Sequence, residues 1–212
     1  MSWLTSSNRA RVATLDSGQF QSWLKKYQYE LKDEIPQLEA MCRHIQAFSH
    51  SQLRRIVKWK LFFDKRRLTR ALNLFDATED DSSIRRKTKI LFDDELGSEE
   101  KVHLIGGHGG GRTCQSCRST KIASVGIPVA STVLRFIEPS KYGIIDQYAM
   151  DALLELGFEG VCTKKQWGGQ PPQYRFEPID YADYNELITC IAEKVCMTPS
   201  QVDMALWSYR KA

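Results

Sequence analysis

Residues 124–146 read SVGIPVASTVLRFIEPSKYGIID, and this stretch decides how the rest of the chain is interpreted. It begins with a turn at Val125, Gly126 and Ile127, where we expect the glycine to adopt backbone angles that other residues avoid. Pro128 follows, at a position where the first turn of a helix tolerates the loss of a backbone N–H. The segment therefore predicts a tight turn that leads directly into a helix.

Five apolar residues after this turn share one face of the expected helix: Val129, Ala130, Val133, Leu134 and Ile137. The opposite face is expected to contact solvent. Pro139 ends the helix, because proline lacks the N–H that a further turn requires. After a short link, Asp146 stands at the start of a second helix, which Gly157 ends. The sequence therefore predicts a carboxylate at a helix N-terminus.

This order of elements resembles the helix-hairpin-helix DNA glycosylase superfamily, the group that includes endonuclease III and 8-oxoguanine glycosylase. The family signature is a GVGxK hairpin, a helix, a short link and an aspartate, and residues 124–128 occupy the hairpin. Ala130 matches the small residue of the next helix, and the separation of Pro128 from Asp146 matches that of the family's lysine and aspartate. The resemblance implies an all-α fold, with two helical lobes around a cleft. It also implies a single domain over residues 1–212, with the hairpin and the aspartate at about 119–157.

The chain departs from the family at the hairpin lysine. Members that also cut the strand use this lysine as an amine nucleophile, whereas Pro128 has no amine. The resemblance therefore implies a monofunctional enzyme, which excises a damaged or modified base and leaves an abasic site. Residues 56–60 (IVKWK) and 203–209 (DMALWSY) resemble a small branch of the superfamily. Because related proteins occur in bacteria and with phages, a role in antiviral defence is a further expectation beside DNA repair. The target would then be a hypermodified phage base.

Asp146 is the predicted catalytic residue. Cleavage of an N-glycosidic bond gives the sugar oxocarbenium character, which a nearby carboxylate stabilises. The alternative is that Asp146 only caps its helix, a role that stabilises a protein by about 1 kcal/mol. The superfamily spacing favours catalysis.

The expected DNA contacts come from the hairpin and from a basic block. Backbone N–H groups of Val125, Gly126 and Ile127 are expected to bind a phosphate at the helix N-terminus; the alternative is a plain tight connection between helices. The basic block comprises Arg54, Arg55, Lys58, Lys60, Lys65, Arg66, Arg67 and Arg70. Arg66 and Arg67 are its predicted DNA contacts, and the alternative is a solvated helix face.

An enzyme that acts on a base must extrude it and hold it between apolar faces and polar groups. We expect Trp59 to stack on the base and Lys60 to donate to the base or a phosphate. Gln147 and Tyr148, which follow Asp146, complete the expected base pocket. The alternative is that these residues pack in the core or lie on the surface.

A glycine-rich stretch, residues 106–117 (GGHGGGRTCQSC), is predicted to be a mobile loop that closes over a nucleic-acid strand. His103, His108, Cys114 and Cys117 are zinc candidates, but their spacing fits no standard finger and the glycines are not expected to preorganise them. Cys162, Cys190 and Cys196 lack the four-cysteine pattern of the superfamily's iron–sulfur cluster. We therefore predict no metal and no cofactor, and a zinc-assisted protein is the third alternative.

The bulk composition is that of a globular chain: 212 residues, 42% hydrophobic, 26% charged, with a net charge of +4 and a pI near 8.7. These values are compatible with a polyanionic partner. The N-terminus lacks the apolar core of a signal peptide, and no apolar run reaches the ~20 residues of a membrane span. We expect a soluble, cytoplasmic protein whose partner is DNA, with no membrane association and no obligate protein partner.

The remaining helices are expected at residues 20–31, 36–48, 51–75 with a break at Asp64, 84–92, 98–105, 185–195 and 200–209. Residues 1–15 are predicted to be a loose or partly ordered lead-in, and residues 162–184 an irregular segment. Two functions remain open: a monofunctional DNA glycosylase, or a non-catalytic helix-hairpin-helix module that only binds DNA.

Overall fold

The computed structural model describes residues 2–27, 31–109, 112–164 and 172–211. In these ranges all the secondary-structure elements are helices. The predicted all-α class is therefore confirmed. Within the same ranges, no helix is both long and apolar enough to cross a membrane.

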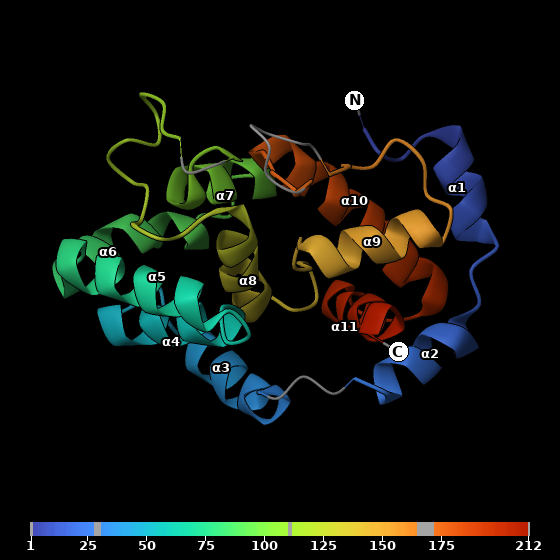
Figure 1. The fold of residues 1–212 in the computed structure, drawn as a ribbon, viewed down its shortest axis with the longest axis horizontal. Coiled ribbons are helices and arrows are strands. Elements are labelled where there is room, and N and C mark those ends of the chain that lie inside the picture. Colours follow the sequence, from blue (N-terminus) through green and yellow to red (C-terminus); the bar gives the residue numbers. More distant parts are fainter. Residues whose placement is uncertain (1, 28–30, 110–111, 165–171, 212) are drawn as a thin grey trace.

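Figure 1 shows the helices in two groups. The first group contains α3 (Ile35–Cys42), α4 (His50–Lys60), α5 (Lys65–Thr78), α6 (Asp81–Thr88), α7 (Ser98–Gly106) and α8 (Ile127–Ile137). The second contains α1 (Ser6–Ala13), α2 (Ser17–Lys25), α9 (Gln147–Glu155), α10 (Pro178–Val195) and α11 (Pro199–Lys211). The 3-10 helices Lys32–Glu34 and Lys89–Phe92 precede α3 and follow α6. The chain thus starts in the second group, crosses to the first and returns before α9.

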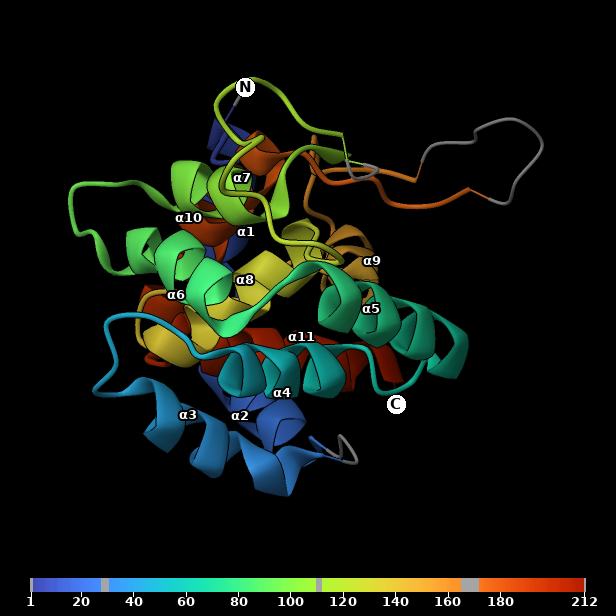
Figure 2. The same cartoon turned by 90° about the vertical axis from the view of Figure 1, so that its left-hand side faces the viewer.

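Helix α8 is the central element. It packs against α3, α4, α7 and α10 (Figures 1 and 2). Residues 129–136 are all buried, so the expectation of a solvent-exposed face on this helix is wrong. Its buried polar side chains have protein partners: the Thr132 hydroxyl donates to the Pro128 carbonyl at 2.7 Å, the Arg135 Nε donates to the Ser200 hydroxyl of α11 at 2.7 Å, and the Arg135 guanidinium pairs with Glu39 at 2.8 Å. Burial on all sides fixes both ends of α8, and hence the turn before it and the link after it.

The described N-terminal residues contain a full helix, where the sequence predicted a loose or partly ordered lead-in. Helix α1 begins after Thr5, whose side chain accepts the N–H of Asn8 at 3.2 Å. The Asn8 amide is buried: it donates to the carbonyls of Trp3 (2.7 Å) and Glu159 (2.8 Å), and it accepts the N–H of Glu159 at 2.9 Å. These long-range bonds attach the first residues to the far end of the chain.

Replacing Asn8 with alanine is expected to lower the free energy of unfolding by about 2 kcal/mol, because the backbone groups of Trp3 and Glu159 lose the partner that the buried Asn8 amide supplies. Urea unfolding followed by circular dichroism measures the change. The matched control is Asn73→Ala on the exposed side of α5, which should change stability by less than about 0.5 kcal/mol. Equal stability of the two variants would contradict the bracing role of Asn8.

Several helix boundaries follow the sequence, and others do not. The predicted break at Asp64 is confirmed, since its carboxylate accepts the N–H of Arg67 at 2.9 Å and starts α5. Helix α10 begins at Pro178, earlier than predicted, because Glu177 and Asp180 form a reciprocal capping box around that proline. The irregular segment predicted over residues 162–184 is therefore wrong from Pro178 onward, and its residues 165–171 lie outside the described ranges.

Candidate functional site

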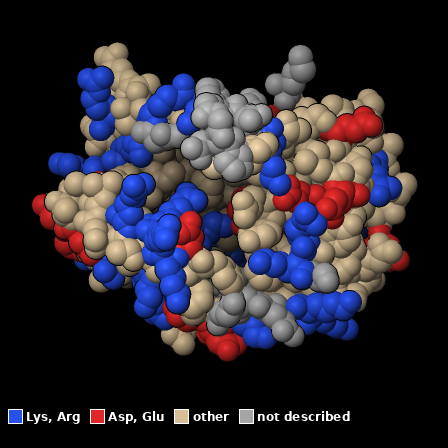
Figure 3. All heavy atoms as spheres, in the orientation of Figure 1, with Lys and Arg blue, Asp and Glu red and all other residues tan. Residues whose placement is uncertain are grey.

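A cleft of about 1680 Å³ lies between α4, α5 and the turn before α8 on one side, and α9 and α11 on the other. Every residue predicted for catalysis, DNA contact or base recognition lines it: Trp59, Lys60, Arg66, Arg67, Val125, Gly126, Ile127, Asp146, Gln147 and Tyr148. Figure 3 shows a hollow at the centre of this face, with basic side chains gathered beside it. Segments far apart in the sequence thus meet at one surface.

Asp146 caps α9. One carboxylate oxygen, Oδ1, accepts the backbone N–H groups of Tyr148 (2.9 Å) and Ala149 (3.1 Å). The other, Oδ2, accepts Lys60 Nζ at 2.8 Å, and the side chains of Lys60 and Asp146 are 13% and 20% exposed. The capping role considered from the sequence is therefore real. It also holds the carboxylate rigidly at the cleft wall, so capping and catalysis do not exclude each other.

A second carboxyl group, Asp203 of α11, lies beside this pair and also lines the cleft. Its side chain is buried, and it accepts the hydroxyl of Tyr184 at 2.7 Å. Burial raises the pKa of Asp203 from 3.8 to about 7, and the negative charge of Asp146 adds to the rise, while Tyr184 and Lys60 oppose it. The site thus contains two carboxyl groups in different environments, a property that enzymes use to separate acid and base roles.

The turn before α8 differs from its predicted geometry. Gly126 has a φ of −110° and a ψ of 179°, extended angles that any residue can adopt, and the left-handed residue is Ser124 with a φ of 65°. A Cβ added to Gly126 would meet no atom within 4 Å. Helix α8 has no side-chain cap, and its first turn lines the cleft. The predicted phosphate contact by the Val125 N–H is not supported, because that group donates to the Ile122 carbonyl at 3.2 Å, which leaves the N–H groups of Gly126 and Ile127 as the candidate donors.

The close packing in this region depends on another glycine, Gly106 at the end of α7. A Cβ there would lie 3.2 Å from the Ala130 Cβ and 3.3 Å from backbone atoms of Gly126 and Ile127. The small side chain at position 130, noted from the sequence, therefore serves the contact between α7 and the turn.

The structure divides the basic block. Arg54 pairs with Asp76 at 2.9 Å, and neither Arg54 nor Arg55 lines the cleft. The exposed side chains that do line it at the start of α5 are Lys65, Arg66, Arg67 and Arg70. Within the described residues, no carboxylate pairs with these four. Lys60, the other member of the block that lines the cleft, pairs with Asp146, so the unpaired charge that faces the cleft comes from α5.

Of the base-pocket residues, Trp59 has the least free surface. Its indole is 4% exposed, donates to the Leu31 carbonyl at 3.1 Å and packs edge-on against Phe136 with ring centroids 5.1 Å apart. This packing makes Trp59 a wall of the cleft, so its position does not support the predicted stacking on a base. Gln147 is exposed and Tyr148 is half-buried.

Phe63 and Trp207, which the sequence analysis did not propose for the base pocket, also line the cleft. Trp207 of α11 stacks with Phe63 (centroids 6.4 Å apart) and lies edge-on to Tyr148 at 6.0 Å. Lys211 Nζ lies 4.7 Å from the Tyr148 ring centroid. The same ammonium lies 5.7 Å from the Phe63 centroid and 5.6 Å from the Trp207 centroid, so these three rings form one aromatic cluster around Lys211 at the cleft.

Comparison of the chain with family models, curated proteins and solved structures finds no match. The superfamily resemblance of residues 124–146 stays a prediction. The sequence analysis did not name Asp203 and Lys121 as site residues, although both line the cleft. A carboxylate within the buried stripe of α11 is unusual, and this could have indicated Asp203. No sequence pattern indicates Lys121, because only the folded chain brings it to the turn. Lys121 Nζ donates to the Val125 carbonyl at 3.3 Å, and burial lowers its pKa.

Proposed function

We propose that this chain is a monofunctional DNA glycosylase of the helix-hairpin-helix type. The observation that carries the proposal is the carboxylate of Asp146, which two backbone N–H groups hold at the wall of a cleft. The same cleft is lined by the turn at Gly126 and by exposed arginines of α5. A carboxylate, a phosphate-binding turn and a basic surface are the three elements that excision of a base from DNA requires.

In the proposed reaction, phosphates contact the arginines and the N-terminus of α8, and the target nucleotide rotates into the cleft. The bond between C1′ and the base nitrogen breaks, and the base leaves with the electron pair and takes up a proton. Asp146 stabilises the positive charge that develops on the sugar. A water oxygen then bonds to C1′ and its proton passes to the carboxylate, leaving an abasic site.

Lys60 and Pro128 are the residues that bear on whether the proposed enzyme also cleaves the DNA strand. Pro128 stands at the hairpin position and cannot form a Schiff base. Lys60 is bonded to the Asp146 carboxylate, and its ammonium reaches a base or a phosphate by exchanging that partner. Strand cleavage is therefore not part of the proposed activity.

The test is incubation of the protein with duplexes that carry damaged or modified bases, including hypermodified phage bases, followed by heating in alkali. We expect strand breaks at one class of base after alkali and none before it. A panel without a single break would contradict the enzymatic proposal. Breaks before alkali, with a borohydride-trapped protein–DNA complex that is lost in Lys60→Ala or Lys121→Ala, would contradict its monofunctional character.

A second function is favoured by one observation: both oxygens of Asp146 already accept protein donors. In that alternative, the aspartate is structural and the chain is a DNA-binding module. Binding of DNA without release of any base in the same panel would identify it.

The basic surface of α5 is expected to contact phosphates in either function. Replacing Arg66 and Arg67 together with alanine should weaken DNA binding about tenfold and lower the slope of log affinity against log salt by about 2. Fluorescence anisotropy over a range of salt concentrations measures both. Arg54→Ala with Arg55→Ala is the matched control, since these residues lie outside the cleft. An equal loss in both double variants would contradict a specific role of α5.

A further inference from the structure

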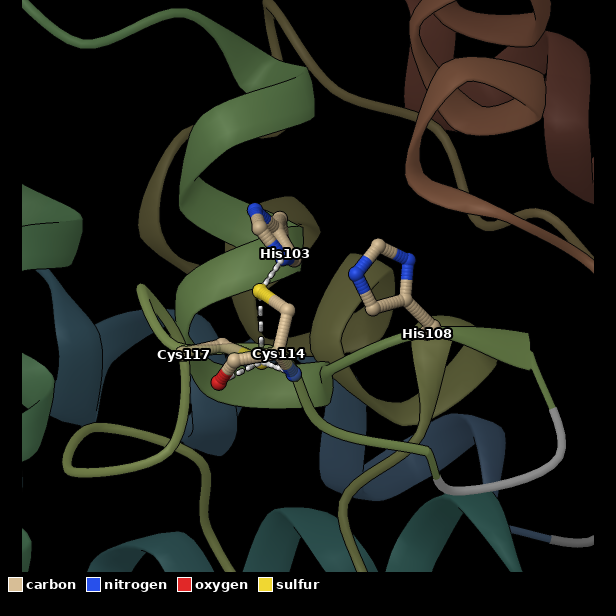
Figure 4. Close-up of side chains that lie close together, drawn as sticks. All are labelled: His103, His108, Cys114 and Cys117. Atoms are coloured by element: carbon tan, nitrogen blue, oxygen red, sulfur yellow. Dashed lines mark hydrogen bonds between the residues drawn. The ribbon is translucent and has the colours of Figure 1, made fainter.

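Four potential metal ligands converge beside the cleft: His103 of α7, His108, Cys114 and Cys117. One ligand atom from each lies within 4.8 Å of all the others. Figure 4 shows the Cys114 sulfur between His103 and Cys117, with one ring nitrogen of His108 turned toward them. Residues separated in the sequence by the glycine-rich stretch therefore form one compact cluster.

Two distances within the cluster are close to the edges of a tetrahedral zinc site. Cys114 Sγ lies 3.6 Å from Cys117 Sγ and 3.2 Å from His103 Nε2. With Zn–S bonds of about 2.3 Å and Zn–N bonds of about 2.0 Å, the edges of a tetrahedron are about 3.8 Å and 3.5 Å. A disulfide would bring the two sulfurs to about 2.05 Å. The cysteines are thus spaced as ligands of one ion rather than as a covalent pair.

The glycines beside the cluster are part of its scaffold, contrary to the expectation that they would not preorganise the ligands. Gly107 ends α7 with a φ of 71°, and a Cβ there would lie 2.7 Å from the Arg112 carbonyl oxygen. A Cβ on Gly109 would lie 2.7 Å from a Glu177 carboxylate oxygen. The Phe176 carbonyl oxygen would lie 2.9 Å from the Gly109 Cβ, so backbone atoms leave no room for a side chain at either position. Glycine on both sides of His108 therefore lets the chain pass close to its neighbours, and the mobility predicted for residues 106–117 stays a prediction.

Glu177 supplies the outer contact that zinc-bound histidines usually have. Its carboxylate lies 3.3 Å from His108 Nδ1 and accepts the backbone N–H of Gly109 at 3.1 Å and Arg112 at 2.7 Å. With Nδ1 directed at Glu177, Nε2 of His108 is available to a metal. On the other side, the Cys114 N–H donates to Cys117 Sγ at 3.2 Å, a contact that stabilises a thiolate.

We propose that His103, His108, Cys114 and Cys117 bind one Zn²⁺ ion in a closed tetrahedral site. Four protein ligands leave no position for water or substrate, so the site is structural. Two thiols lose their protons to solvent on binding, and no oxidation is involved. The ion would join the end of α7 to the segment that leads to Gly126. His108 and Gly109 line the cleft, so the ion would also hold its rim.

The experiment is metal analysis of the purified full-length protein after exposure to excess zinc and removal of free ions. We expect about one tightly bound zinc per chain. Cys117→Ser and His103→Ala should each lose it, whereas Cys196→Ser, an exposed cysteine outside the cluster, should keep it. Since a cluster variant can fail to fold, Co²⁺ added to the wild-type protein gives a second measurement. Tetrahedral ligand-field bands with thiolate charge transfer are the expected spectrum.

Thiol alkylation followed by mass spectrometry separates zinc binding from a disulfide. With zinc present, Cys114 and Cys117 should resist alkylation and then react after a chelator is added, while Cys196 reacts throughout. A folded wild-type protein that binds no zinc and gives no tetrahedral cobalt spectrum would overturn the proposal. Cysteines that react only after reduction would do the same. None of these readouts depends on base excision.

Discussion

Replacement of Asp146 with asparagine is expected to slow base excision by about 10²- to 10³-fold, the effect of removing one preorganised electrostatic group from a transition state. Asparagine caps helices as well as aspartate does, so α9 should stay intact. The variant removes the negative charge while the amide oxygen still accepts the N–H groups of Tyr148 and Ala149. Single-turnover excision rates on the best substrate of the panel measure the change.

The control for this variant is Asp80→Asn, the exposed cap of α6, which accepts the N–H of Ser83 at 2.6 Å and lies outside the cleft. It should excise at the wild-type rate. Circular dichroism should show both variants folded. An Asp146→Asn protein that excises as fast as wild type would leave this carboxylate with a capping role only, and the proposed mechanism would fail.

Replacement of Asp203 with asparagine is expected to remove a pH dependence of stability. In the wild type, burial raises the pKa of Asp203 from 3.8 to about 7. Between these values the unfolded chain ionises while the folded protein keeps its proton, so the free energy of unfolding falls as pH rises. The loss reaches up to about 4 kcal/mol above pH 7, and it is absent below pH 4. Asparagine still accepts the Tyr184 hydroxyl but does not titrate.

The measurement is urea unfolding of wild type and Asp203→Asn at pH 5 and pH 8. The stability of the variant relative to wild type should increase at the higher pH. Asp33→Asn, an exposed carboxylate before α3, should follow the wild-type profile at both values. Parallel profiles for wild type and Asp203→Asn would show that this carboxyl group is ionised in the folded protein at both pH values.

Local signals in the sequence predicted local structure well. The helix from Ile127, the break at Asp64 and the cap at Asp146 each depend on neighbouring residues, and all three are present; the turn before the helix is also present, but its left-handed residue is Ser124 rather than Gly126. The ion pair of Lys60 with Asp146 spans 86 positions, and no periodicity indicates such a contact. Its existence depends on how α4 and α9 are brought together by the buried α8.

The wrong expectation for α8 and the unexpected packing of the glycine-rich stretch also arise from contacts between residues far apart in the sequence. A helix is predicted to have a wet face when its pattern contains Ser131, Thr132 and Arg135, but these side chains bond to carbonyls or to partners on other helices and are buried. Glycine-rich segments are predicted to be mobile because the cost of ordering them is high. At Gly107 and Gly109 the neighbouring backbone and Glu177 approach so closely that only glycine fits.

The chain passes from the second group of helices to the first and then back, and this path affects when each helix can pack during synthesis. Helices α1 and α2 emerge before α10 and α11, against which they pack. Their apolar surfaces are therefore covered only after α10 and α11 have been made, and contacts of such high sequence separation form slowly. We expect the nascent chain to expose Phe20 and Trp23 until α11 leaves the ribosome, which makes α2 a binding segment for a chaperone.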